Sequence, residues 1–227
     1  MITEIIDLIQ NRWDFFLELL VEHIQISLLS IAIAMVIGLI IGIVISEYQK
    51  SSRIVIGIVN FIYTIPSISL LGFLIPLSGV GDTTAVIALT VYALLPMVRN
   101  THTGLTNVSP LLLEAATGMG STRLQTLVKV RLPLAMPVII SGIRNMAVMT
   151  IALSGIASFI GAGGLGVAIY RGITTNNKAM TLVGSLLIAV LAIVVDVLIG
   201  QVEKKTKRHS VASVSYTHLT LPTNSRV

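Results

Sequence analysis

Residues 24–46 read IQISLLSIAIAMVIGLIIGIVIS and include no charged side chain. A helix that crosses a membrane needs about 20 mostly apolar residues, because each residue advances it by about 1.5 Å through a hydrocarbon layer of about 30 Å. This stretch therefore predicts a transmembrane helix, and the chain contains more stretches of the same kind.

Four further apolar stretches follow it, at residues 54–77, 83–98, 137–160 and 180–200. The third is the shortest and contains Pro96 near its end. Only Arg144 and Asp196 are charged within the five stretches, although the whole chain has 15 Lys and Arg and 10 Asp and Glu. We predict an all-α integral membrane protein with about five transmembrane helices.

The overall composition agrees with this prediction. The chain is 54% hydrophobic with a mean hydropathy of +0.93, and only 11% of its residues are charged, against about 25% in a soluble domain. High hydrophobicity also excludes intrinsic disorder. The chain has no cysteine, which excludes disulfide scaffolds, thiol catalysis and cysteine-ligated metals.

The positive charges indicate how the chain is oriented. Lys and Arg accumulate on the cytoplasmic side of membrane proteins. Ten of them fall on the side that receives loops 47–53 and 99–136 and the C-terminus, whereas the opposite side has only Arg12, Arg171 and Lys178. We therefore place the N-terminus outside and the C-terminus inside a bacterial plasma membrane. The net charge of +5 is then a mark of topology and does not indicate nucleic-acid binding.

Two terminal segments flank the membrane domain, which we assign to residues 24–203. In residues 1–23, apolar side chains recur at helical spacing opposite an acidic face, without the pattern of a cleavable signal peptide. This predicts an external amphipathic helix, either on the membrane surface or packed on a partner protein. Residues 204–227 form a basic end followed, from 211 to 227, by a tail that resembles a cloning scar; we exclude it from the functional reasoning.

The longest polar loop, residues 99–136, is the strongest functional candidate, because loops held by a rigid scaffold often carry function. Ser109 and Pro110 are typical of a helix start, and Gly120 of a helix end in the left-handed conformation. A second short helix over 122–130 is expected to stop before Pro133. The pattern predicts a cytoplasmic helix–turn–helix that is suited to docking in a groove of a partner.

The same loop has a specific motif. Glu114-Ala115-Ala116, then Gly120, then Val130-Arg131-Leu132-Pro133 resembles the signature loop of permease subunits of ATP-binding-cassette importers, except that isoleucine is commoner at position 130. The resemblance implies that this loop forms coupling helices that dock on a cytoplasmic ATP-binding subunit. The residues that it assigns to this contact are Glu114, Ala115, Ala116, Gly120 and Pro133.

Residues 63–67 (YTIPS), 92–100 (YALLPMVRN) and 159–166 (FIGAGGLG) resemble the osmoprotectant branch of these permeases. The resemblance implies import of glycine betaine, carnitine or choline, with an external substrate-binding protein and a second permease copy or paralogue. The chain has no GxxxxGK[ST] motif, so we expect a non-enzymatic subunit whose partner hydrolyses ATP, without cofactor or metal. The alternatives are the same architecture for another solute such as an amino acid, or an ATP-independent channel or scaffold.

Two sets of residues within the spans are candidates for function. Ionisable residues inside a membrane are costly, so Arg144 and Asp196 are expected either to pair near the cytoplasmic gate or to reach separately toward headgroups and water. Pro66 interrupts the second span, and nearby hydroxyl groups could line a polar pathway, although a kink can also serve packing alone. The pathway candidates are Thr64, Pro66, Ser67 and Ser69.

The stretch Gly161–Gly166 formally fits GxGxxG, the fingerprint of dinucleotide binding. That motif requires a preceding strand and a βαβ unit, whereas here it follows a membrane span on the outer side. We interpret it instead as a tight turn where backbone meets backbone or substrate.

Overall fold

The computed structural model of the chain describes residues 2–211, and every regular element within them is helical. Four units are long and apolar enough to cross a membrane: α2 (Trp13–Glu47), α5 (Asp82–Thr106), the continuous stretch Arg123–Ile160, and α10 (Lys178–Val211). A fifth span results if the bent pair α3 (Gln49–Thr64) and α4 (Ser67–Ser78) counts as one. The predicted all-α membrane fold with about five spans is confirmed.

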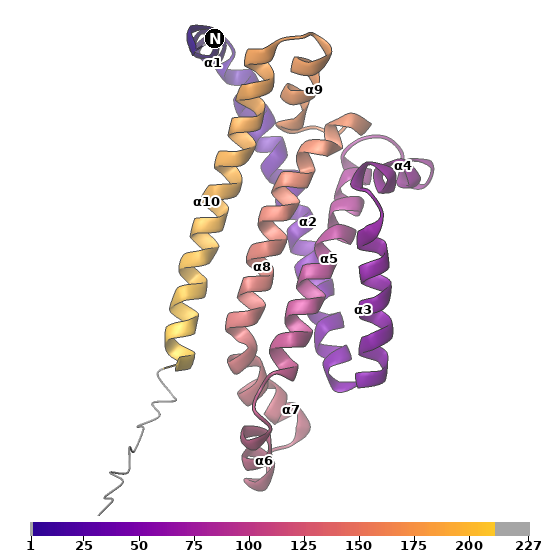
Figure 1. Ribbon diagram of the computed structural model, residues 1–227, viewed down its shortest axis with the longest axis vertical. Helices are drawn as coiled ribbons and strands as arrows, with labels where there is room; N and C mark the ends of the chain where they lie inside the picture. Colours follow the sequence, from indigo (N-terminus) through magenta and orange to yellow (C-terminus); the bar gives the residue numbers. More distant parts are fainter. Residues whose placement is uncertain (1, 212–227) are drawn as a thin grey trace, which may run out of the picture.

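The helices run side by side along the long axis of the molecule (Figure 1). One end holds α1 (Ile2–Asn11) and α9 (Gly166–Thr174), and α4 lies in the same half but further in. The other end holds α6 (Pro110–Gly118) and α7 (Arg123–Thr126). The latter end is the cytoplasmic one by the charge distribution above. The described part of α10 also ends toward this side.

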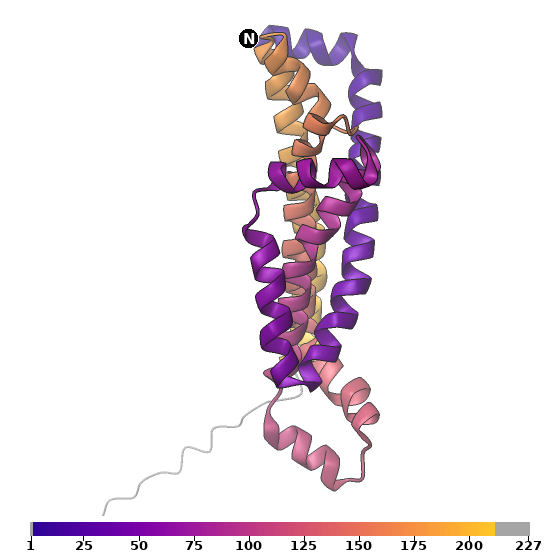
Figure 2. The same ribbon diagram turned by 90° about the vertical axis from the view of Figure 1, so that its right-hand side faces the viewer.

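The second span differs from the expected single kinked helix over 54–77. It breaks completely at Pro66, and α3 and α4 meet at 97°, so α4 lies across the bundle (Figure 2). A residue before proline is biased away from the helical region, and Ile65 has an extended ψ of 127°. Pro66 then begins the next helix by accepting hydrogen bonds from the amides of Ser69 and Leu70.

The third span is longer than the sequence indicated. We expected it to cover 83–98, because Pro96 lies near the end of the apolar stretch, but α5 continues through Pro96 to Thr106. A proline inside a helix removes one hydrogen bond, and a helix supported by neighbours can tolerate this loss. The polar residues that follow are therefore part of the helix and not of a loop.

The N-terminal segment is also divided differently. Instead of one helix over residues 1–23, α1 ends at Asn11 and α2 begins at Trp13, with Arg12 between them at φ −133° and ψ 33°. The apolar face of α1 packs against a cluster that includes Phe16 of α2 and Met180 of α10. Part of the apolar face of α1 is thus covered by α2 and α10 of the same chain, whereas the sequence analysis expected the membrane surface or a partner protein to cover it.

The centre of the molecule is the contact of α2 with α5, and α8 (Leu132–Ser154) packs beside them. Two glycines of α2 face α5 directly: a Cβ built on Gly38 would lie 2.7 Å from Met97 Cγ, and one on Gly42 would lie 2.5 Å from Thr101 Cβ. Small residues allow such close approach between membrane helices. The three helices form the frame that holds the cytoplasmic loop.

Candidate functional site

The protruding cytoplasmic segment starts with α6. Pro110 occupies its first turn, where the missing amide hydrogen costs nothing. The helix ends at Gly118, and Gly120, two residues later, has a φ of +83°. The amide of Gly120 donates to Thr117 O at 2.9 Å, and that of Ser121 donates to Ala116 O at 3.1 Å. This is the Schellman pattern of helix termination, and it sets the direction in which the chain leaves α6.

The return segment begins with a capping box. The Gln125 amide donates to Thr122 Oγ1 at 3.3 Å, and the Thr122 amide donates to Gln125 Oε1 at 2.9 Å, which pairs two amides at the start of α7. The stop that we expected before Pro133 does not occur: α7 passes through the π-helical turn η1 (Leu127–Arg131) into α8. In this wider turn the Leu132 amide donates to Leu127 O, so the helix accommodates Pro133 without ending.

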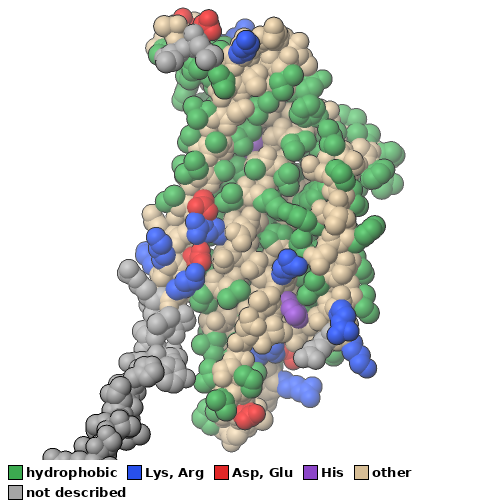
Figure 3. Space-filling view, viewed as in Figure 1, with side chains coloured by type: hydrophobic (Ala, Val, Ile, Leu, Met, Phe, Trp, Pro, Cys, Tyr) green, Lys and Arg blue, Asp and Glu red, His purple; other side chains and the backbone are tan. Residues whose placement is uncertain are grey.

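The structure gathers the five residues of the signature motif around this segment. Glu114, Ala115, Gly120 and Pro133 are exposed, and Ala116 is buried. The three most exposed large apolar side chains on the same segment are Leu111 at 75%, Met119 at 81% and Leu124 at 70%. Figure 3 shows hydrophobic side chains and an acidic one at this tip.

The sequence analysis missed these three residues. Their sequence signal was an apolar run and a methionine inside an otherwise polar loop. Apolar side chains that protrude beyond the membrane domain mark an interaction surface, so the tip has the composition of a docking site.

The structure brings Arg144 of α8 and Asp196 of α10 together. Arg144 Nε lies 2.6 Å from Asp196 Oδ1, and Nη2 lies 2.6 Å from Oδ2. Arginine and carboxylate are well matched for such a two-point contact. Arg144 Nη1 also donates to Glu203 Oε2 at 3.3 Å. Figure 3 shows acidic and basic side chains grouped on this flank.

Sequence reasoning did not find Glu203, although its spacing could have indicated it. Glu203 follows Asp196 by seven residues, two helical turns, so both lie on one face of α10. Gly200 lies between them, and a Cβ there would be 3.2 Å from Arg144 Cζ. Lys207 Nζ completes the group, 2.6 Å from Glu203 Oε1. The result is an ion-pair network that joins α8 to α10.

The pathway candidates Thr64, Pro66, Ser67 and Ser69 lie at the break between α3 and α4. The Thr64 hydroxyl is used within its own helix, where it donates to Phe61 O at 2.6 Å. Two tyrosines lie beside the break, a contact that the sequence analysis did not predict. The rings of Tyr63 and Tyr92 pack edge to face with centroids 5.8 Å apart.

Both tyrosine hydroxyls are engaged. Tyr92 donates to Ile65 O, and Tyr63 donates to Met149 Sδ at 3.1 Å. These contacts hold the break against α5 and α8. The polar break thus has a defined position on the face of the bundle.

At the outer end, the glycine stretch forms a turn, and carboxylates hold it. The amide of Gly163 donates to Asp82 Oδ1 at 2.8 Å, and that of Gly164 donates to Glu22 Oε2 at 2.9 Å. Asp82 begins α5 and Glu22 belongs to α2, so the turn ties two helices together. Among residues 2–211 no strand precedes it, which removes the structural context of a dinucleotide site.

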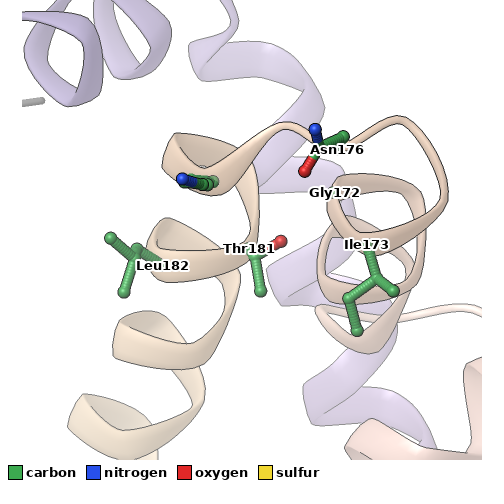
Figure 4. A pocket seen from close by; sticks show the side chains of 6 residues that line it. Gly172, Ile173, Asn176, Thr181 and Leu182 are labelled. Atoms are coloured by element: carbon green, nitrogen blue, oxygen red, sulfur yellow. The ribbon is translucent and has the colours of Figure 1, made fainter.

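A hollow of about 470 Å³ lies nearby between α9 and α10 (Figure 4). Aliphatic and polar residues both line it, namely Gly172, Ile173, Asn176, Lys178, Thr181 and Leu182. Within the described residues, no group of three or more His, Asp or Glu side chains could hold a metal ion.

Comparisons with known proteins agree on one family. Residues 27–208 match the family described as binding-protein-dependent transport system inner membrane component. The choline transport system permease protein OpuBB of Bacillus subtilis (strain 168) is 39% identical over 201 residues, which cover 88% of this chain and 93% of that protein. The osmoprotectant import permease protein OsmW of Salmonella typhimurium is 41% identical over 187 residues, covering 80% and 87%.

Solved structures give the same result for the fold. A structure of inward-facing conformations of the MetNI methionine ABC transporter superposes with a TM-score of 0.78 at 25% identity, covering 84% of this chain and 95% of that one. Another crystal form of the same transporter superposes with a TM-score of 0.75 at 26% identity, covering 82% of this chain and 93% of that one.

Proposed function

The chain belongs to the family of binding-protein-dependent transport system inner membrane components, and from this premise we propose that it is the permease subunit of an ATP-driven importer for quaternary-ammonium osmoprotectants. Choline, carnitine and glycine betaine are the solutes in its relatives' names. The chain is a multi-pass protein of the bacterial plasma membrane and is not itself an enzyme. The resemblance noted from the signature loop and its osmoprotectant branch is confirmed.

One observation supports the coupling role most directly. The cytoplasmic tip exposes Leu111, Met119 and Leu124 beside the exposed carboxylate Glu114. A group of large apolar side chains exposed to water, away from the lipid, marks a surface that a partner covers. We propose that a cytoplasmic ATP-binding subunit covers this tip through a helix-in-groove contact.

The other partners follow from the same proposal. The outer end, where the glycine turn and the α9–α10 hollow lie, would receive an external substrate-binding protein. A second permease copy or paralogue would complete the pathway, because residues 2–211 of one chain contribute four or five spans. Movement of the ATP-binding subunits would reach the spans as a rigid-body switch between two states. Thr64, Ser67 and Ser69 are the hydroxyl groups that we assign to the solute path.

The test is uptake by proteoliposomes that contain this chain, its ATP-binding subunit and its binding protein. We expect ATP-dependent uptake of labelled choline, carnitine or glycine betaine, and weaker uptake of methionine. Glu114→Arg should abolish both recruitment of the ATP-binding subunit and uptake, while membrane insertion continues. Undiminished recruitment and uptake in this variant would remove the docking assignment.

The alternative solute, an amino acid, rests on the structural neighbour whose description names methionine. The relatives at 38–41% identity are named for osmoprotectants, which favours the quaternary amines. An uptake competition among unlabelled choline, glycine betaine and methionine discriminates between the two classes of solute.

A further inference from the structure

Arg131 lies at the base of the protruding segment, where η1 passes into α8. Its side chain is only 13% exposed. Nε and Nη2 donate to Leu105 O at 3.4 and 3.3 Å, and Nη1 donates to the Glu47 carboxylate. Nη2 also lies 3.5 Å from Ser46 Oγ. One guanidinium therefore connects three parts of the chain.

Each contact is at the end of a membrane-spanning helix. Glu47 is the last residue of α2, and Leu105 lies in the last turn of α5. Carbonyl groups in a last turn have no partner within their own helix, so Arg131 satisfies an oxygen that α5 leaves free. Arginine suits this position because its planar group presents five donors in a fixed arrangement.

The tip has no comparable direct contact with these helix ends. Within the described residues, α6 packs on α7 and η1 and not closely on α2 or α5. A hollow of about 260 Å³ separates them, with Leu113 and Thr117 of α6 on one side and Glu47 and Arg131 on the other. Apart from the short link 107–109, the tip reaches the spans through α7 and η1, where Leu127 packs against the cluster that includes Leu105 and where Arg131 contacts the ends of α2 and α5.

Resting on the proposed function, we propose that Arg131 is a positioning residue that transmits movement of the α6–α7 segment to the cytoplasmic ends of α2 and α5. The π-helical turn beside it supports this role, since such turns are frequent at functional sites. Arg131 is not one of the docking residues: its guanidinium faces the membrane domain, and its partners belong to this chain.

The test uses the complete importer in proteoliposomes, with ATP hydrolysis and choline uptake measured on the same sample. For Arg131→Ala we expect normal recruitment of the ATP-binding subunit and continued ATP hydrolysis. Uptake per ATP hydrolysed should fall by about tenfold or more, because several hydrogen bonds of one charged group are lost and about 1.4 kcal/mol corresponds to a factor of ten. The matched control is Arg53→Ala, which removes an exposed positive charge from the same side, in the second turn of α3.

Two further variants keep the test decisive if Arg131→Ala folds poorly. Arg131→Lys retains the charge but not the planar fork, so we expect an intermediate coupling ratio. Glu47→Ala removes one of the partners and should by itself lower the coupling ratio, whether or not Arg131→Ala folds. Where Arg131→Ala folds, its effect on coupling and that of Glu47→Ala should be non-additive. Unchanged coupling in both Arg131→Lys and Glu47→Ala, or additive effects of Arg131→Ala and Glu47→Ala, would overturn the proposal.

A loss of uptake that merely parallels a loss of ATP-binding subunit would also overturn it, since Arg131 would then act in docking. Failure of the proposed function gives a different result, namely no ATP-dependent uptake by the unmodified importer.

Discussion

The contact of α2 with α5 allows a sharp test, because one chemical change at two glycines should have opposite effects. A Cβ on Gly42 would lie 2.5 Å from Thr101 Cβ and 3.2 Å from Val98 O. A Cβ on Gly57 of α3 would meet nothing within 4 Å. We therefore compare Gly42→Ala with Gly57→Ala.

The expected cost at Gly42 follows from which atoms are in contact. Carbon atoms pack at about 3.5–4.0 Å, so α2 and α5 must separate by about 1 Å. Thr101 Cβ is attached directly to the backbone and cannot rotate away. Overpacking of this kind costs about 1–3 kcal/mol. At Gly57 the same change should stabilise the helix by up to about 1 kcal/mol, the usual helix-propensity difference between alanine and glycine.

The measurement is the thermal unfolding midpoint of each purified variant in the same detergent. For a chain of this size, each kcal/mol shifts the midpoint by about 2–4 °C. We expect the midpoint to fall by several degrees for Gly42→Ala and to stay level or rise slightly for Gly57→Ala. Equal midpoints, or a more stable Gly42→Ala, would refute the close approach of α2 and α5.

Three other predictions concern the site. Gly120→Ala should reduce coupled uptake and lower stability by about 1–2 kcal/mol, because alanine is strained at a φ of +83°; an unchanged thermal midpoint would contradict this. In a double-mutant cycle, Arg144→Ala and Asp196→Ala should have non-additive effects on uptake, since either change breaks the same contact; additive losses would remove the pair. Glu22→Ala combined with Asp82→Ala should speed proteolysis within the glycine turn, because two anchoring hydrogen bonds are lost; cleavage at the unmodified rate would argue against that anchoring.

Much of the fold could be predicted because lipid imposes a simple rule. A span must be about 20 apolar residues long, and its ends must carry the charges. Residues 24–46 and 180–200 satisfied this rule clearly, and the helices α2 and α10 contain them. The rule does not predict whether a proline breaks a helix or is tolerated within it. The break at Pro66 and the continuous helix through Pro96 were therefore both misjudged.

The protruding tip was predictable for a different reason. Its helix limits depend on local interactions, a proline start at Pro110 and a left-handed glycine at Gly120, and both occur where the sequence placed them. The helix end that we expected before Pro133 did not occur. A π-helical turn continues the helix there, and the local sequence pattern does not predict this turn.

The sequence by itself determined that this chain lies in a membrane, which side faces the cytoplasm by its charges, and where a helical segment protrudes. These properties depend on composition and on interactions between residues close in the chain.

Only the tertiary structure decided which distant side chains meet. Arg131 joins Glu47 across 84 positions, and Glu203 joins Arg144 across 59. Such contacts depend on how α2, α5, α8 and α10 pack, and packing is set by the shape of whole helix faces. This is why the residues that we infer to transmit movement were absent from the sequence prediction.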